Sequence, residues 1–324
     1  MVPVSEKLLV ASIRRAADRG PRIPLGIGDD CAILGVPKGH EVMVTTDFSL
    51  EGMHFRREWH TPEVIGHRCL TRGLSDIAAM GGIPIAAFLS LAVPRHLAQA
   101  WVSRFLKGLL ALAEVFHVRL AGGDTAESPD GVLADIVVVG SAPKGKAIRR
   151  SGARPGDGIY VTGELGSAAA ALELLFSGRK LRAAAFPYHF HPMPRIEVGR
   201  SLREKHLSSA MIDISDGLST DLAHVCEESG VGAEIQAEAI PVAKIGRPQR
   251  RVDLRFALHG GDDYELLFTT PRGKYIPARI AGVKVTLIGQ ITRGKRVLLI
   301  KNGTRTRLAP QGWEHFRKPS RFAR

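Results

Sequence analysis

Aspartates recur along the chain in short segments that also contain glycine or small apolar residues. The most informative segment is Thr45-Thr46-Asp47, which follows the apolar run 41–44 and precedes a turn that contains Gly52 and His54. The other aspartates with such neighbours are Asp29, Asp30, Asp76, Asp124, Asp213 and Asp216. A carboxylate among apolar neighbours is costly to bury unless a cation shares the site. The pattern therefore favours carboxylates that gather around divalent cations.

Each of these aspartates, taken alone, also has a simple structural interpretation. Asp29 and Asp30 fit a solvated acidic turn equally well, and adjacent strand residues point to opposite faces, so only one of them is expected to face a given ion. Asp76 lies among the small residues of 73–82, where tight helix packing with a capping aspartate is an alternative to close contact with a phosphate. Glycines next to Asp124 permit ligand contact with backbone amides.

An alternation of strands and helices is expected to position these residues, typically at strand ends, where α/β proteins place their chemistry. Hydrophobic periodicity predicts helices over 5–18, 63–80, 97–115, 167–176, 218–229 and 252–258. It predicts strands over 41–44, 86–93, 118–121, 135–141, 158–162, 210–213, 233–235, 266–269, 283–288 and 296–300. A polar stretch rich in Gly and Pro at 143–157 indicates a boundary between two domains, 1–145 and 146–324.

Composition places limits on the partners and the compartment. The 324 residues carry a formal charge of +13, but the basic residues are scattered, and no basic recognition helix accompanies them, so we expect no nucleic-acid partner. The longest apolar region, 83–93, is too short for a membrane span. Cys31, Cys69 and Cys226 lie far apart, which favours buried free thiols in a reducing compartment. The sequence thus predicts a cytoplasmic protein that does not bind membranes.

Eight segments, taken in order, resemble those of the thiamine-monophosphate kinases, a family of the aminoimidazole-ribonucleotide synthetase superfamily of ATP-using enzymes. A Walker loop, a protein-kinase signature and a Gly-x-Ser-x-Gly elbow are absent from the sequence. The resemblance runs from Ser5 to Phe316. The segments are 26–30, 45–47 with 51–55, 74–81, 122–125, 150–153, 213–218, 264–268 and 312–316.

The resemblance implies a mixed α/β (α+β) fold of two domains of the aminoimidazole-ribonucleotide synthetase-like type, with N-terminal sheets that pair across a homodimer. It implies phosphorylation of thiamine monophosphate to thiamine diphosphate, with ATP as co-substrate and several Mg²⁺ ions as cofactors. The N-terminal domain would bind metal and ATP and form the dimer.

The resemblance also implies roles for individual residues. The implied Mg²⁺ ligands are Asp30, Thr45, Thr46, Asp47, Asp76, Asp124, Asp213 and Asp216. The implied ATP contacts are Gly123, Asp124, Arg150 and Ser215. His54, Asp262 and Trp313 would bind the substrate, with Trp313 stacked on an aromatic ring of the cationic thiamine. Two positions depart from the family, which usually has Glu where this chain has Asp262 and often Asn where it has Gly73.

The residue inventory suits direct in-line transfer. The oxygen of a phosphate monoester is already ionised at neutral pH, so no general base is needed, and the obstacle is to bring two polyanions together. His54 is therefore expected to contact the substrate and not to act as a base. Two alternatives are another ATP-using enzyme of the same superfamily and a non-catalytic protein that binds a nucleotide or thiamine phosphate.

Overall fold

The structure is a computed structural model that describes residues 15, 22–27, 31–246, 248–314 and 316. The expected helix at 5–18 and both Asp29 and Asp30 lie outside the described residues, apart from Arg15. The chain divides into two compact units. Unit 1 contains residues 1–77 and 82–147, and unit 2 contains residues 78–81 and 148–324.

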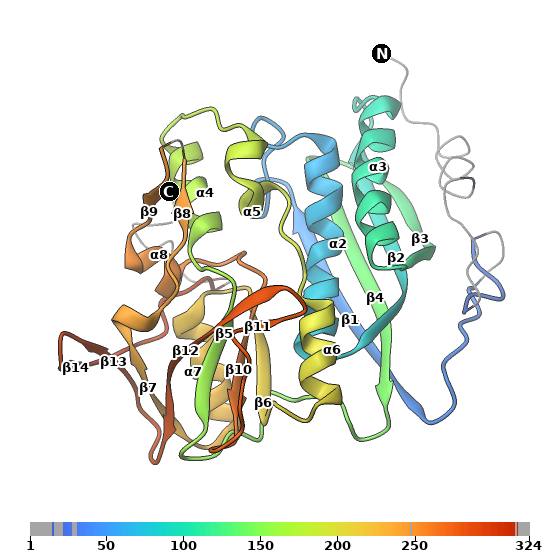
Figure 1. Ribbon diagram of the computed structural model, residues 1–324. Coiled ribbons are helices and arrows are strands. Elements are labelled where there is room, and N and C mark those ends of the chain that lie inside the picture. The colour runs from blue at the N-terminus through green and yellow to red at the C-terminus, as the bar shows by residue number, and fades with distance from the viewer. Residues whose placement is uncertain (1–14, 16–21, 28–30, 247, 315, 317–324) are drawn as a thin grey trace. The chain divides into compact units, whose positions relative to one another are not determined.

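Unit 1 is a four-stranded sheet with two helices on one face (Figure 1). The strand order is β1-β4-β2-β3, in which β2 and β3 are parallel and the other pairs are antiparallel. The strands are β1 (His40–Leu50), β2 (Ile83–Pro94), β3 (Arg119–Ser128) and β4 (Leu133–Pro143). The helices are α2 (Pro62–Ala79) and α3 (Gln99–Val115), close to the expected ranges.

Two glycines allow α2 and α3 to pack backbone against backbone. A Cβ at Gly66 of α2 would lie 2.0 Å from the carbonyl oxygen of Phe105, and one at Gly108 of α3 would lie 1.9 Å from that of Glu63. Apolar side chains at helical spacing on α3, among them Phe105 and Leu109, are fully buried. The close crossing therefore depends on the absence of side chains at these two positions.

The strands β1 and β3 are longer than expected, and this changes the place of two motifs. We expected one buried strand to end in Thr45-Thr46-Asp47 and another to end before Gly122. Both expectations were wrong, because pairing continues past the motifs, with Asp47 opposite Ile136 and Asp124 opposite Ser90. The motifs therefore lie within strands, and side chains that are adjacent in sequence point to opposite faces of the sheet.

Unit 2 is built on an eight-stranded sheet in the order β14-β13-β7-β12-β5-β10-β6, with β11 beside β12. Its strands are β5 (Gly158–Thr162), β6 (Ala210–Ile214), β7 (Gly232–Gln236), β10 (Glu265–Thr270), β11 (Arg279–Ile280), β12 (Val283–Thr292), β13 (Val297–Lys301) and β14 (Thr304–Arg307). A separate hairpin pairs β8 (Lys244–Ile245) with β9 (Arg250–Arg251).

The helices of unit 2 are α4 (Ser167–Phe176), α5 (Pro187–Phe190), α6 (Ile196–Glu204), α7 (Leu218–Ser229) and α8 (Leu254–His259). Two short 3₁₀ turns, η1 (Ala183–Ala185) and η2 (Ala237–Ala239), complete the unit. Helix α7 packs against β6, β7, β10 and β13 and supplies Leu218, Leu222 and Val225 to the core. The sequence predicted α4 and α7 at their observed bounds but did not predict α6 or β14.

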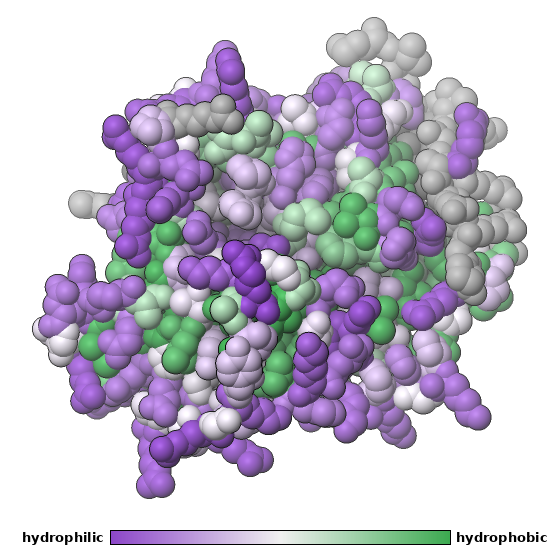
Figure 2. Space-filling view, viewed as in Figure 1, coloured by the Kyte–Doolittle hydropathy of each residue, from purple (hydrophilic) through white to green (hydrophobic). Residues whose placement is uncertain are grey.

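The surface of the described residues is largely hydrophilic in the view of Figure 2.

Cys69 and Cys226 are buried as expected, whereas Cys31 is exposed because it lies in a loop and not in the core. Among the described helices, none is both long and apolar enough to cross a membrane.

The contact between α2 and α3 gives a prediction about stability. Gly108→Ala would drive a methyl group into the Glu63 carbonyl, so we expect a loss of about 1–3 kcal/mol in the free energy of unfolding. Denaturant titration followed by circular dichroism measures this loss. Ser103→Ala, on the exposed side of α3, is the matched control and should change stability little. Equal stability of both variants would contradict the packing described above.

Candidate functional site

Three of the predicted ligand side chains lie together on the helix-covered face of unit 1. Thr45 and Asp47 alternate with exposed residues of β1, and the Thr45 hydroxyl donates a hydrogen bond to the Asp76 carboxylate of α2. The pKa of Asp47 is raised to about 7, chiefly by burial and further by the neighbouring carboxylates of Asp76 and Asp135, while Arg72 opposes the rise. Two carboxylates and a hydroxyl that meet in a partly buried place are hard oxygen donors, and Arg72 does not offset the combined effect of burial and neighbouring carboxylates on Asp47. This donor set fits Mg²⁺.

Two other predicted ligands of unit 1, Thr46 and Asp124, lie on the opposite, open face of the sheet. The Thr46 hydroxyl donates to Asp135 Oδ1 at 2.7 Å, and Asp135 is in register with Ser90, which is in turn in register with Asp124. Register partners share a face of a sheet. The side chains of Thr46 and Asp124 are therefore not gathered with Thr45, Asp47 and Asp76, because the strand alternates where a loop had been expected.

Asp135 was not identified from the sequence as part of the site. It begins the run that was expected to be a strand, and no glycine follows it. Its position between Thr46 and Ser90 follows from strand pairing, which the local sequence does not reveal.

The backbone conformation and the close packing at position 123 require glycine. Its φ is +145°, and a Cβ would lie 1.9 Å from the Leu89 carbonyl oxygen. Asp124 follows it with an exposed side chain whose Oδ1 accepts the N–H of Thr125 at 2.8 Å. The segment thus presents backbone and a carboxylate on an open surface of the sheet.

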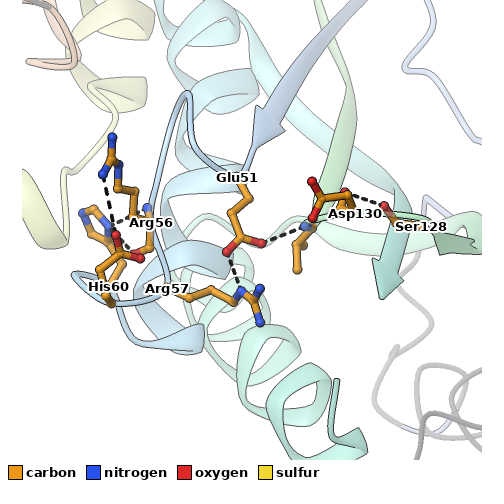
Figure 3. A network of polar contacts seen from close by, with 8 residues as sticks. Glu51, Arg56, Arg57, His60, Ser128 and Asp130 are labelled. Carbon is orange, nitrogen blue, oxygen red and sulfur yellow. Dashed lines mark hydrogen bonds and ion pairs between the residues drawn. The ribbon is translucent and has the colours of Figure 1, made fainter. Parts of the chain in front are cut away.

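The loop at 51–60 is held by polar contacts on both sides of His54 (Figure 3). Glu51 accepts hydrogen bonds from Arg57 Nε and from the Val132 N–H, the latter at 2.8 Å. The Arg56 guanidinium lies 4.6 Å from the centroid of the Trp59 ring. His54 Nδ1 accepts the Leu50 N–H at 2.9 Å. In the neutral ring the proton is then on Nε2, which is a donor suited to a phosphate oxygen.

In unit 2, three segments that are far apart in sequence meet through main-chain hydrogen bonds. The segment after β6 offers its carbonyl groups, and the N–H of Asp262 donates to the Ser215 oxygen at 2.9 Å. The N–H of Trp313 donates to the Asp216 oxygen at 3.0 Å. Four residues implied in metal, nucleotide and substrate binding, Ser215, Asp216, Asp262 and Trp313, are thereby brought together. The Trp313 side chain is 40% exposed, so it is accessible.

Glycines make these approaches possible. A Cβ at Gly261 would lie 2.3 Å from the Ser215 oxygen, and one at Gly312 would lie 2.1 Å from the Asp216 oxygen. The next segment contains two non-glycine residues with left-handed backbone, Asp262 at φ 64° and Tyr264 at φ 51°. Such conformations cost on the order of 1–3 kcal/mol each and tend to cluster at functional sites.

Further buried carboxylates support this region of unit 2. Asp221 Oδ2 accepts the N–H groups of Gly217 (2.9 Å) and Asp216 (3.3 Å), and burial together with nearby Asp213 and Asp216 raises the pKa of Asp221 well above its ordinary value. Burial likewise raises the pKa of Asp263, whose Oδ2 accepts the Gly166 N–H at 2.8 Å. Asp221 thus fixes the loop after β6. Its only signal in the sequence is that it is a carboxylate in the first turn of α7.

A buried ion pair lies beside the same segment. Arg195 Nε donates to Glu265 Oε2 at 2.7 Å, and the Thr162 hydroxyl donates to the same oxygen at 2.5 Å. The pair thus ties the start of β10 to the N-terminal end of α6 and, through Thr162, to the end of β5, while strand pairing places Glu265 opposite Ile214 of β6.

Arg150 lies at the other end of β6. The carbonyl group of its neighbour Arg149 accepts the Met211 N–H at 2.9 Å, and the Arg150 carbonyl group accepts from the Ser229 hydroxyl at the end of α7. Ser215 follows the last residue of β6. Within unit 2 the structure therefore does not bring the backbone of Arg150 together with Ser215.

No ready-made metal centre exists among the described side chains, since no three His, Cys, Asp or Glu residues of 22–27, 31–246 and 248–314 cluster closely enough to hold an ion. Asp30, an implied ligand, lies outside this part of the chain. The two-carboxylate arrangement of Asp47 and Asp76 is thus the densest acidic feature described in unit 1.

Both units match the domains of one class of proteins. Residues 28–142 match the model of the AIR synthase related protein N-terminal domain, and residues 154–301 match that of the C-terminal domain. Fold and site together define a two-domain protein of the AIR synthase related class. The mixed α/β fold with two domains of this type is confirmed.

Individual relatives define the family more narrowly than the domain models do. The chain is 37% identical over 311 residues to the thiamine-monophosphate kinase of Salmonella typhimurium, with 92% of this chain and 93% of the relative covered. It also resembles the crystal structure of thiamine-monophosphate kinase from Stenotrophomonas maltophilia, with 33% identity, a TM-score of 0.79, and coverage of 94% of this chain and 99% of that one. The chain belongs to the thiamine-monophosphate kinase family, which confirms the resemblance found in its eight segments.

A third relative carries ligands. The structure of AaThiL complexed with AMPPCP and TMP has a TM-score of 0.76 and 32% identity, and covers 90% of this chain and 92% of that chain.

The raised pKa of Asp47 predicts a pH effect on the metal-free protein. The folded state holds a proton up to about pH 7, whereas an aspartate of ordinary pKa 3.8 loses it, so stability should fall as pH rises between these values. Asp47→Asn removes the penalty and should raise the unfolding free energy relative to wild type by on the order of 2 kcal/mol at pH 8, with little gain at pH 4.

Denaturant titrations in EDTA at the two pH values measure this difference. Asp253→Asn, an exposed helix cap that Asn also serves, is the matched control. A gain that is the same at both pH values would show that Asp47 does not carry the penalty.

Proposed function

We propose that the protein transfers the γ-phosphoryl group of ATP to the phosphate of thiamine monophosphate and forms thiamine diphosphate and ADP. The carrying observation is the similarity over nine-tenths of the chain to thiamine-monophosphate kinases, together with the AaThiL complex with AMPPCP, an ATP analogue, and TMP. Identity of 37% that extends through both units favours this activity over that of another ATP-using enzyme of the class.

The residues of unit 1 that would hold Mg²⁺ are Thr45, Asp47 and Asp76. Their fit rests on the donor chemistry, because the raised pKa of Asp47 reflects buried carboxylates that a divalent cation would neutralise. By family resemblance, further proposed ligands in unit 1 are Asp30 and, on the other face of the sheet, Thr46 and Asp124, and the proposed ligands in unit 2 are Asp213 and Asp216. When bound, Mg²⁺ screens the charge of the phosphates and aligns them.

The reaction requires little covalent chemistry from the protein. A phosphate oxygen of thiamine monophosphate attacks the γ-phosphorus, the bond from that phosphorus to the β–γ bridging oxygen breaks, and the electron pair leaves with ADP. The attacking oxygen is already ionised, so the residues act by holding the two polyanions in position. His54 Nε2–H is assigned to a phosphate oxygen of the substrate, since its Nδ1 is occupied by the Leu50 N–H.

The remaining contacts are assigned from the resemblance and the geometry of unit 2. Asp262 and Trp313 would bind the cationic thiamine beside Ser215, which would contact ATP with Gly123, Asp124 and Arg150. The common anchoring of Asp262 and Trp313 on the loop after β6 supports a joint role. Ser215, assigned to ATP, and Asp262 and Trp313, assigned to the substrate, are thus joined by hydrogen bonds to the same stretch of main chain.

The first test is turnover. Purified protein with thiamine monophosphate, ATP and Mg²⁺ should yield thiamine diphosphate and ADP in equal amounts, measured by chromatography. Asp47→Asn should lower the rate at least about 100-fold because it removes a charge from the proposed metal ligands. Asp253→Asn should keep wild-type activity. Binding of both ligands without any ADP would instead indicate a non-catalytic binding protein, and ADP without thiamine diphosphate a different acceptor.

We further propose that the open face of the unit 1 sheet pairs with a second copy of the chain. Val42, Val44 and Phe48 alternate along β1 with exposed fractions of 55%, 65% and 56%. Residues Ala32 and Leu34 pack with Phe88 over the β2 and β3 side, so the exposed apolar strip follows β1. An apolar strip of this kind is typical of a protein interface, and the family resemblance implies a homodimer.

This interface predicts a change of mass. Phe48→Asp places a charge in the strip and should convert a dimer into a monomer, as measured by size-exclusion chromatography with light scattering. Val115→Asp changes a side chain of equal exposure at the end of α3 and should leave the dimer intact. A wild-type monomer, or a dimer that survives Phe48→Asp, would exclude this face.

A further inference from the structure

The three side chains of the segment Asp262-Asp263-Tyr264 in unit 2 have different surroundings and contacts. The buried Asp263 carboxylate accepts the Gly166 N–H at 2.8 Å at the start of α4. Tyr264 is 1% exposed, and its hydroxyl donates to Asp262 Oδ1 at 2.6 Å. The phenol therefore reaches back past Asp263 to the carboxylate two residues before it.

The main chain keeps this pair in register. The N–H of Asp262 donates to the Ser215 oxygen and that of Tyr264 to the Ile214 oxygen, both at 2.9 Å. Asp263 between them is held by α4, so the backbone can neither slide nor rotate without breaking one of three hydrogen bonds. Left-handed backbone at both Asp262 and Tyr264 is the cost of this geometry.

We propose that Tyr264 is a positioning residue that orients the Asp262 carboxylate toward the cationic thiamine part of the substrate and so sets affinity for thiamine monophosphate. The inference rests on the proposed function. Aspartate has a short side chain with few rotamers, and a buried donor at 2.6 Å fixes which way its carboxylate plane faces. Because Tyr264 is 1% exposed, its proposed effect on the substrate is exerted through Asp262.

A merely structural phenol would not require this arrangement. Tyr160, in the same unit, stacks on Phe268 with ring centroids 5.4 Å apart and fills space through its ring alone. Tyr264 instead combines complete burial with a charge-assisted hydrogen bond and strained backbone at both partners. The removal of its hydroxyl should therefore affect one ligand and not the fold.

Steady-state kinetics of Tyr264→Phe test the proposal. We expect the KM for thiamine monophosphate to rise about tenfold, as for loss of a hydrogen bond to a charged group, with the KM for ATP unchanged. Tyr160→Phe removes the same hydroxyl from a residue outside the site and should match wild type. Thermal unfolding should show Tyr264→Phe folded, since the ring remains. An equal rise in both KM values, or no rise, would overturn the proposal.

A double-mutant cycle with Asp262→Asn shows whether Tyr264 acts through Asp262. Asp262→Asn alone should raise the KM for thiamine monophosphate, and Tyr264→Phe should add little in that background. Multiplied effects would refute the positioning role. A neutral Asp262→Asn would also refute it, and this result can be obtained even if Tyr264→Phe fails to fold.

Calorimetric titration with thiamine monophosphate separates this proposal from the proposed function. If wild type neither binds nor phosphorylates it, both fail. If wild type does both and Tyr264→Phe binds equally well, the positioning role alone fails.

Discussion

The cost of burying carboxylates constrains both units. Asp47, Asp221 and Asp263 have raised pKa values because burial disfavours their charged forms, but the surroundings of Asp47 differ from those of the other two. Backbone N–H groups serve Asp221 and Asp263, and a buried arginine serves Glu265. Asp47 has a second carboxylate, Asp76, as its neighbour, and Arg72 opposes the resulting rise in its pKa only in part. The structural acids Asp221 and Asp263 accept backbone N–H groups, whereas the acid assigned to metal binding lies beside another carboxylate.

Main-chain hydrogen bonding organises the substrate side of unit 2. The carbonyl groups of residues 214–216, at the end of β6 and directly after it, receive N–H groups from the 262–264 segment and from Trp313. Glycines at 261 and 312 permit contacts that any side chain would block. Asp221 fixes the same loop from within α7. Residues assigned to nucleotide and to substrate therefore share one backbone template, so a shift of this loop would move both sets together.

Because side chains alternate along a strand, the two faces of the unit 1 sheet differ, one polar beside the helices and the other partly apolar and exposed. One face carries Thr45 and Asp47 against α2, and the other carries Val42, Val44, Thr46 and Phe48. Strand alternation allows a single segment to serve a polar site and an apolar surface. The same alternation explains why adjacent threonines, which look equivalent in the sequence, donate hydrogen bonds to different aspartates.

The sequence by itself determined the family, the mixed α/β class and most helix bounds, because ordered motifs and hydrophobic periodicity are local properties of the chain. It also identified Ser215, Asp216, Asp262 and Trp313 as candidate site residues, which the structure brings together. Only the tertiary structure decided which side of a strand each candidate faces, that Asp135 lies beside Thr46, and that Tyr264 holds Asp262. Strand register and left-handed loop backbone set these relations, and both depend on partners distant in sequence.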